Sequence, residues 1–565
     1  MDAQELPVRP SLEQYKKQAK DLVKVFKALR TRKSGDPEAI QRVKKHHPRL
    51  AKLPDSEVTS AKFALADAQL VIAREHGFEN WPKFAKNIEA LTGERSVASL
   101  DDPRSAFIEA ACVPRDSGHA SGTLELAEAI LAAHPGVASS DIHTAAILGD
   151  DIAVRRFLAR DPGNATVKGG PHGWDALTHL CFSRYLRLDR ARSNGFVRAA
   201  TALLDAGASA NTGWMEENHE PRPEWESALY GAAGVAHHAE LTRLLLERGA
   251  DPNDDETPYH APETHDNAAL KILVESGKLN KESLGMILLR KTDWHDYEGI
   301  KWLLECNVDP NRRTRWGKTA IHNAMLSDND IKIFEVLLDH GADPTLIADS
   351  PHRGQPSSSG AGRSAVAMAA RRGRRDVLEL FARRGISTEL RGVEGLIAAC
   401  ARNDVASARV TTESEPHLVR EVVAEGGRLL AEFAGVGNAE GVGQLLDLGV
   451  DVRAVFEEGD GYFDVAKNST ALHLAAWRAH HATVKLLIER GAPVDVADGK
   501  GRTPLALAVR ACVDSYWAYR RSPDSVQMLL HAGASVDGVD FPSGYAEVDE
   551  LLRRHGAGLE HSTGG

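Results

Sequence analysis

Apolar residues near the start of the chain repeat at helical spacing. Successive members of the series are three or four positions apart, which is typical of one stripe of an amphipathic helix; they are Leu12, Tyr15, Ala19, Leu22, Phe26 and Leu29. The other face is basic, with Lys16, Lys17, Lys20, Lys24, Lys27 and Arg30. No aromatic residue interleaves these cations, so a solvated face is the simpler interpretation, and contact with nucleic acid or membrane is the alternative.

Start and stop signals for further helices follow. Asp36 before Pro37 is typical of an N-cap, and a second start at Asp55 or Ser56 predicts a helix that ends at Gly77. A shorter helix is expected from Asn80. Residues 1–95 are therefore predicted to form a small helical module.

Beyond residue 100 one pattern recurs: a small-residue helix start, a pair of bulky apolar residues, then Gly-Ala-Asp or a variant of it. The clearest copy is STALHLAAWRAHHATVKLLIERGAPVDVAD at 469–498, followed by GRTPLALAV at 501–509. Thr503 and Pro504 suit the N-cap and first position of a helix, and Gly491 suits a left-handed helix end. Leu487 and Ile488 are expected to fill the layer between repeats.

These units resemble the ankyrin repeat. The resemblance implies an all-α solenoid of helix-turn-helix units with hairpin loops, preceded by the helical module. The array is placed at 100–565, with about twelve units and a C-terminal cap. Units are expected to begin near residues 104, 141, 173, 226, 256, 283, 317, 362, 394, 427, 469 and 501. The strings LPVRPSLEQ and FALADAQLVIAREHGFENWPKF also resemble a leader module of bacterial ankyrin proteins.

Several units are longer than the ankyrin period of about 33 residues. The terminating glycines Gly207 and Gly249, for example, are roughly 42 residues apart, which implies insertions of about nine residues. We place these insertions at 186–194, 456–464 and 513–522. A flexible loop is expected at 350–362, which is rich in Ser, Gly and Pro.

Composition favours a folded cytoplasmic protein. A net charge of −11 argues against wholesale binding of nucleic acid or anionic membrane, and no apolar run is long enough to span a bilayer. A signal-independent export route stays open. The five cysteines are far apart and form no CxxC pair, so reduced core thiols are expected. We expect a monomer.

Candidate catalytic chemistry is sparse. His322 and His473 occupy the Thr-x-x-His position of the repeat, where the resemblance implies that the ring bridges loop backbones. His260 and His265 lie near several acidic residues, but their irregular spacing favours an acidic loop over a metal site. The chain contains no GxGxxG, GxxxxGK[ST] or GxSxG motif. No catalytic, cofactor or metal site is expected.

The resemblance therefore implies a non-enzymatic scaffold that binds a protein partner through the concave face and hairpin tips. The first alternative is an effector or enzyme with its activity in the N-terminal module or the insertions, and the second is nucleic-acid binding through local basic patches. The candidate partner-binding residues are Arg312, Arg313, Arg315, Trp316, Trp477, Trp214, Trp225, Tyr462 and Phe463. These rings could instead cover neighbouring repeats.

Charge is also grouped along the array. Acidic blocks at 216–226 and 251–256 contrast with basic blocks at 311–318 and 371–375. All four blocks are expected to be solvated surface, with the alternative that they orient a partner.

Overall fold

A computed structural model describes residues 12–31, 37–61, 63–115, 118–220, 222–349, 362–515 and 517–557. The predicted cap at Asp36, the side chain of Leu29 and nearly all of the predicted loop at 350–362 lie outside the described residues. The chain divides into two compact units. Unit 1 comprises Met1–Thr257 and Ala268–Leu273, and unit 2 comprises Pro258–Asn267 and Val274–Gly565.

The N-terminal helices share one apolar core within unit 1. They are α1 (Leu12–Thr31), α2 (Pro37–His46), α3 (Asp55–Ser60), α4 (Leu65–Glu75) and α5 (Trp81–Ala98). The predicted stripe on α1 is confirmed at Tyr15, Ala19, Leu22 and Phe26, which are buried against residues of α2, α4 and α5. The single helix expected from Asp55 to Gly77 is wrong, because α3 and α4 are separate. Helix α5 continues past residue 95 and packs on α7.

The remainder of unit 1 consists of helix pairs with one β-hairpin. Its elements, with the two helices α15 and α16 that the division between the units crosses, are α6 (Pro103–Ala111), α7 (Glu125–Ala133), α8 (Ile142–Ile147), α9 (Asp151–Arg160), α10 (Ala176–Cys181), α11 (Arg184–Leu188), α12 (Ser193–Asp205), β1 (Gly213–Glu216), β2 (Glu224–Ser227), α13 (Ala228–Tyr230), η4 (Gly231–Val235), α14 (Ala239–Glu247), α15 (Glu256–His260) and α16 (Ala268–Glu275). Short 3-10 turns are η1 (Pro135–Ser139), η2 (Pro162–Ala165) and η3 (Arg190–Arg192).

Unit 2 continues the helix pairs. Its elements are α17 (Lys281–Asp293), α18 (Tyr297–Glu305), α19 (Ala320–Leu326), α20 (Ile331–Asp339), α21 (Ala365–Arg371), α22 (Arg375–Arg383), α23 (Gly392–Arg402), α24 (Val405–Ser414), α25 (His417–Ala424), α26 (Gly426–Gly435), α27 (Ala439–Asp447), β3 (Val455–Phe456), β4 (Ser469–Thr470), α28 (Ala471–Trp477), α29 (His481–Glu489), α30 (Pro504–Val513), η5 (Ala518–Arg520), α31 (Asp524–His531) and α32 (Ala546–Arg554).

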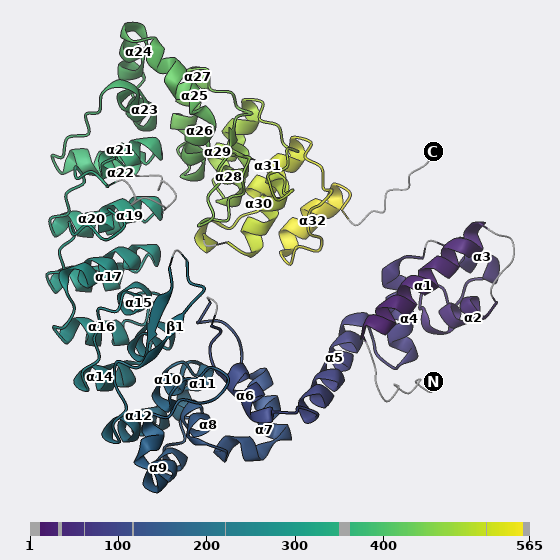
Figure 1. Ribbon diagram of the computed structural model, residues 1–565. Coiled ribbons are helices and arrows are strands. Elements are labelled where there is room, and N and C mark those ends of the chain that lie inside the picture. Colours follow the sequence, from purple (N-terminus) through teal and green to yellow (C-terminus); the bar gives the residue numbers. More distant parts are fainter. Residues whose placement is uncertain are drawn as a thin grey trace. The chain divides into compact units, whose positions relative to one another are not determined.

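Helices stack on their counterparts in neighbouring pairs. In unit 2 the first helices α17, α19, α21 and α23 pack in series, and the second helices α18, α20 and α22 form a parallel series (Figure 1). The same arrangement returns in α26, α28 and α30 beside α27, α29 and α31. Each pair buries its apolar face only against its neighbours, which is the packing of a repeat solenoid. The predicted all-α ankyrin architecture is confirmed.

Individual residues play the parts that the repeat pattern predicts. The Thr503 hydroxyl accepts a hydrogen bond from the Ala506 N–H at 3.2 Å, and Pro504 stands in the first turn of α30. Gly491 has φ +80°, the left-handed conformation that ends α29. Leu487 is fully buried. The repeat pattern therefore predicts the start of α30 and the end of α29.

Two segments of unit 2 that are distant in sequence lie against each other. Arg478, directly after α28, forms an ion pair with Asp328, which is two residues past the end of α19. The Tyr462 hydroxyl, in the predicted insertion at 456–464, donates a hydrogen bond to the Asp293 carbonyl at the end of α17 (2.8 Å). The insertion and α28 thus contact the ends of first helices from earlier repeats of the same unit.

Candidate partner-binding surface

The hairpin loop at 309–319 carries the predicted arginine cluster. Arg312 forms an ion pair with Glu282 (3.0 Å) and Arg313 with Asp349 (3.1 Å), so both guanidinium groups face acids of adjacent segments. The Arg315 side chain is exposed, and its backbone N–H donates to Glu282 at 2.7 Å. Arg312 and Arg313 therefore fix the loop, and Arg315 extends the tip toward solvent.

Trp316 is partly buried at this tip. Its ring packs edge to face with Tyr259, with centroids 5.4 Å apart, and the Arg290 guanidinium lies 4.1 Å from the Tyr259 centroid. Because the Tyr259 ring holds the Trp316 indole in one orientation, Trp316 loses little rotamer freedom when a partner binds. Arg315 lies 6.0 Å from the Trp316 centroid.

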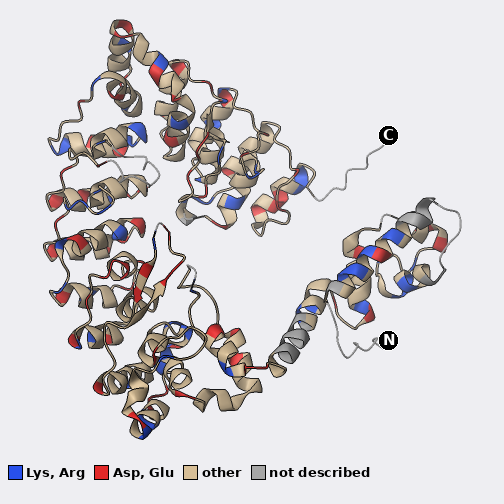
Figure 2. Cartoon of the chain, viewed as in Figure 1, with Lys and Arg blue, Asp and Glu red and all other residues tan. Residues whose placement is uncertain are grey.

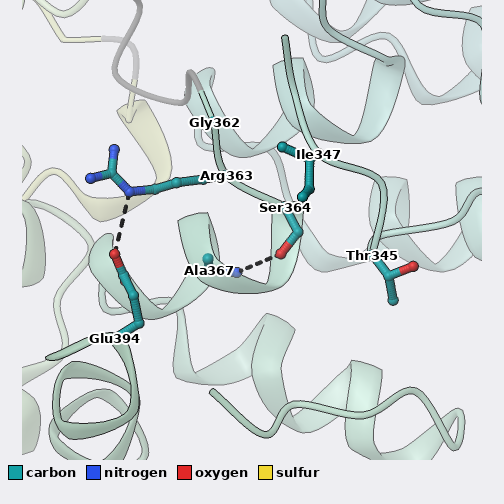
Figure 3. Close-up of a pocket in the computed structure, with 7 residues that line it drawn as sticks. All are labelled: Thr345, Ile347, Gly362, Arg363, Ser364, Ala367 and Glu394. Atoms are coloured by element: carbon teal, nitrogen blue, oxygen red, sulfur yellow. Dashed lines mark hydrogen bonds and ion pairs between the residues drawn. The ribbon is translucent and has the colours of Figure 1, made fainter. Parts of the chain in front are cut away.

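The next hairpin adds an apolar residue beside this tip. The Asp349 N–H donates to the Gly317 carbonyl at 2.9 Å, which joins the two hairpins edge to edge. Ile347 on the second hairpin is 54% exposed. It borders a hollow of about 430 Å³ whose other lining residues are Thr345, Gly362, Arg363, Ser364, Ala367 and Glu394 (Figure 3). We call Arg315, Trp316 and Ile347 the tip surface.

Two predicted binding residues lie in the interior of unit 2. Trp477 is 2% exposed and Phe463 4% exposed, so the expectation that these rings form a binding face is wrong. The insertion covers them: the Trp477 indole N–H donates to the Phe463 carbonyl at 2.7 Å, and Trp517 closes the cluster. Arg510 lies 4.7 Å from the Trp477 centroid. The chain's own loops therefore cover α28 at Trp477.

The β1–β2 hairpin places the two other predicted tryptophans on opposite faces. Trp214 faces the interior at 6% exposure, so the expectation that it contacts a partner is wrong, whereas Trp225 is 40% exposed. The register explains the difference, because Trp214 pairs with Glu226 and Met215 with Trp225, and successive pairs point to opposite faces. Tyr462 is 50% exposed, with its hydroxyl held by Asp293.

The predicted charge blocks are only partly solvated, and that expectation is wrong for several of their residues. In the basic block Arg372 and Arg374 are buried, and both lie within 4 Å of Asp328. Burial alone would raise the pKa of Asp328, but the positive charges of Arg478, Arg372 and Arg374 lower it to about 2. These charges stabilise the packing of unit 2 and contribute no binding surface.

Two residues of the acidic block at 216–226 are also buried. Glu216 and Glu226 are buried beside His119 on the inner face of the hairpin. Acidic residues along the strands of this hairpin are red in Figure 2. Burial, together with the negative charges of Glu256 and Glu216, raises the pKa of Glu226 far above its ordinary value. Burial also raises the pKa of Asp254, to about 6, against hydrogen bonds from Ser227 and Thr257.

Sequence reasoning missed this cluster because its members come from separate segments. His119 lies in the loop between α6 and α7, about 100 residues before the hairpin. The His119 Nε2 atom is 3.5 Å from a Glu216 oxygen, and its Nδ1 atom is 3.9 Å from a Glu226 oxygen. The one sequence signal for this cluster is the occurrence of two glutamates at inward-facing positions of a strand pattern.

The histidines at the Thr-x-x-His position have structural roles. His322 Nδ1 hydrogen-bonds the Thr319 hydroxyl (2.8 Å) and its Nε2 the Leu346 carbonyl (2.9 Å), and His473 bridges Thr470 and Arg502 in the same way. The predicted scaffold role is confirmed for both. The His260 ring hydrogen-bonds Glu263 at 2.9 Å, and Glu263 also pairs with Arg290.

The cysteine thiols have little nucleophilic character where they are buried. Burial raises the pKa of Cys400 to about 12 and that of Cys512 to about 11, and it raises those of Cys112 and Cys181 further. Such thiols stay protonated at neutral pH. Cys306 is exposed, so the expectation of a core position is wrong for this one residue.

Within the described residues, each helix is too short or too polar to cross a membrane. A segment of 85 residues, 15% of the chain, is 38% identical to "Serine/threonine-protein kinase 12" of Arabidopsis thaliana. The chain spans 17% of that relative's length. A family model described as "Ankyrin repeats (3 copies)" matches residues 290–392 and 428–540. These two ranges contain α18 to α22 and α27 to α31, and these parts of the chain are accordingly ankyrin repeats.

Proposed function

We propose that this protein is a non-enzymatic scaffold that binds a protein partner at the tip surface. Ankyrin arrays commonly hold proteins on their hairpin tips and first helices, and the tip surface offers both an arginine and apolar groups of the kind that dominate protein interfaces. The concave side at α28 does not serve this role, because Phe463 and Trp517 cover it. The net charge of −11 supports a protein over a nucleic acid as the partner.

One observation carries the proposal: Trp316 and Ile347 are presented by two hairpins that are joined at Gly317 and Asp349. Both hairpins are fixed before any partner binds, by the hydrogen bond from the Asp349 N–H to the Gly317 carbonyl and by the ion pair between Arg313 and Asp349. A fixed aromatic and aliphatic pair beside an exposed cation suits a partner segment with apolar and acidic side chains. We place this binding event in the cytoplasm, with the protein as a monomer, and the leader strings support a bacterial source.

The test compares partner capture by matched variants. The full-length protein and the variants R315A, W316A and I347D are immobilised, exposed to extract of the native cell, and their bound proteins quantified by mass spectrometry. A partner of the tip surface should be captured at least about tenfold less by W316A and I347D, since loss of a central contact costs about 2 kcal/mol.

The control is V410D, because Val410 on α24 is 61% exposed and lies outside the tip surface. It should capture the partner as the wild type does, and melting temperatures verify that all variants are folded. Equal capture by W316A, I347D and the wild type would contradict the proposal.

A further inference from the structure

The inner face of the β1–β2 hairpin gathers three metal-ligating side chains. Glu216 on β1 and Glu226 on β2 share this face because of the hairpin register, and His119 approaches from the loop between α6 and α7. One potential ligand atom from each residue lies within 4.8 Å of those of the other two. All three residues are buried: His119 is 8% exposed, Glu216 4% and Glu226 0%.

Glu226 lacks the partner that a buried carboxylate requires. Neither of its oxygens accepts a hydrogen bond from any described residue, and among those residues no lysine or arginine lies within ion-pair distance of it. An isolated buried carboxylate is strongly unfavourable, and buried charges are paired or coordinate metals. The neighbouring Glu216 side chain is also a carboxylate and also only accepts hydrogen bonds. The two carboxylates can therefore be joined only by a shared proton or by a cation.

The orientation of His119 favours the cation. Its Nδ1 atom lies 2.8 Å from the Tyr230 hydroxyl and can donate a hydrogen bond to it; in that tautomer the Nε2 lone pair faces Glu216. A histidine that ligates a metal characteristically donates its other ring N–H to such a neighbour. The separation of 3.5 Å between Nε2 and the Glu216 oxygen is close to the edge of about 3.4 Å for a tetrahedron with bonds of about 2.1 Å.

We propose that His119, Glu216 and Glu226 bind a divalent transition-metal ion. One imidazole nitrogen and two carboxylates are a ligand set that Zn²⁺ accepts, and their two negative charges balance the ion. The site is closed to solvent, and its ligands come from a loop and a hairpin that are about 100 residues apart. The ion therefore fixes the loop around His119 to the hairpin and stabilises the inner surface of unit 1 around Trp214 and Tyr230.

Metal binding is tested on the full-length protein, stripped with chelator and titrated with Zn²⁺ or Mn²⁺, with Mg²⁺ as the comparison. The wild type should bind about one equivalent of Zn²⁺ and melt at a higher temperature with it. E226Q and H119Q should bind at least about 100-fold more weakly. E217Q is the matched control, since Glu217 is an exposed neighbour on the hairpin, and it should behave as the wild type.

A second measurement needs no variant: Co²⁺ added to the stripped wild type should give the visible absorption bands of a tetrahedral nitrogen-oxygen site, and Zn²⁺ should abolish them. These bands support the proposal even if E226Q does not fold. The proposal is overturned if the folded wild type shows neither the Co²⁺ bands nor a thermal shift with Zn²⁺ or Mn²⁺. A shared proton would then join Glu216 and Glu226.

Discussion

Arg478 and Asp328 form a buried ion pair between two repeats that are 150 residues apart in the chain. Asp328 also faces Arg372 and Arg374 within 4 Å, so one carboxylate lies among three guanidinium groups. Its removal would leave these cations in the interior without their shared counter-ion.

We therefore expect D328A to be among the most destabilising single changes in unit 2, by about 3–5 kcal/mol. Thermal unfolding followed by circular dichroism measures the effect. The control is D339A, which breaks the exposed ion pair of Asp339 with Arg384 and should cost less than about 1 kcal/mol. Similar melting temperatures for the two variants would show that the buried cluster does not hold unit 2 together.

His480 makes the stability of unit 2 sensitive to acid. Burial, with the positive charges of Arg520 and Arg478, lowers the pKa of His480 to about 3, from an unfolded value of about 6.5. At a pH between these two pKa values, His480 is protonated in the unfolded chain but neutral in the folded chain. The free energy of unfolding therefore falls as the pH falls from about 6.5 toward 3.

H480Q should remove this contribution, because glutamine can accept the Arg520 hydrogen bond without titrating. The wild type should lose stability relative to H480Q by about 1.4 kcal/mol for each pH unit below about 6. Denaturant unfolding of both proteins between pH 7 and pH 4 gives the comparison. Parallel curves would show that the pKa of His480 is the same in the folded and unfolded protein, which would contradict the prediction.

Trp477 and Trp225 should respond in opposite ways to the same substitution. W477A removes a buried indole, its hydrogen bond to Phe463 and its contact with Arg510, and should cost about 3–5 kcal/mol. W225A alters an exposed ring and should cost about 0.5 kcal/mol or less. Melting temperatures decide between the two positions. An unchanged melting temperature for W477A would restore Trp477 as a surface residue.

H322A should destabilise unit 2 by about 1–3 kcal/mol, because it leaves the Leu346 carbonyl and the Thr319 hydroxyl without the ring that joins them. H340A provides the comparison, since His340 is an exposed histidine that bonds only the carbonyl of its own helix turn, at Val336. The proposed structural role of His322 fails if H322A melts no earlier than H340A.

The sequence by itself determined the repeat. Thr503, Pro504 and Gly491 act through their own backbone and nearest neighbours, so their spacing was sufficient to predict the helix ends and the stacking of pairs. The stripe on α1 was predictable for the same reason, because it depends on helical periodicity alone. The scaffold roles of His322 and His473 followed from their place in the repeat.

The tertiary structure decided which side chains are exposed. The insertion that carries Phe463 follows no repeat rule, and it covers Trp477, which the repeat pattern alone would leave facing the concave side. The tip surface could be predicted at Trp316 and Arg315 from the loop position, but Ile347 joined it only through the contact between two hairpins.

The pairing of charged residues was likewise not predictable from the sequence. Asp328 and Arg478, or His119 and the two hairpin glutamates, are about 100 residues or more apart in the sequence, and contacts between such distant residues leave no periodic pattern in either segment. Local sequence fixes the conformation of a repeat because its interactions are short in range. The burial of a loop and the pairing of its charges depend on segments that only the folded chain brings together.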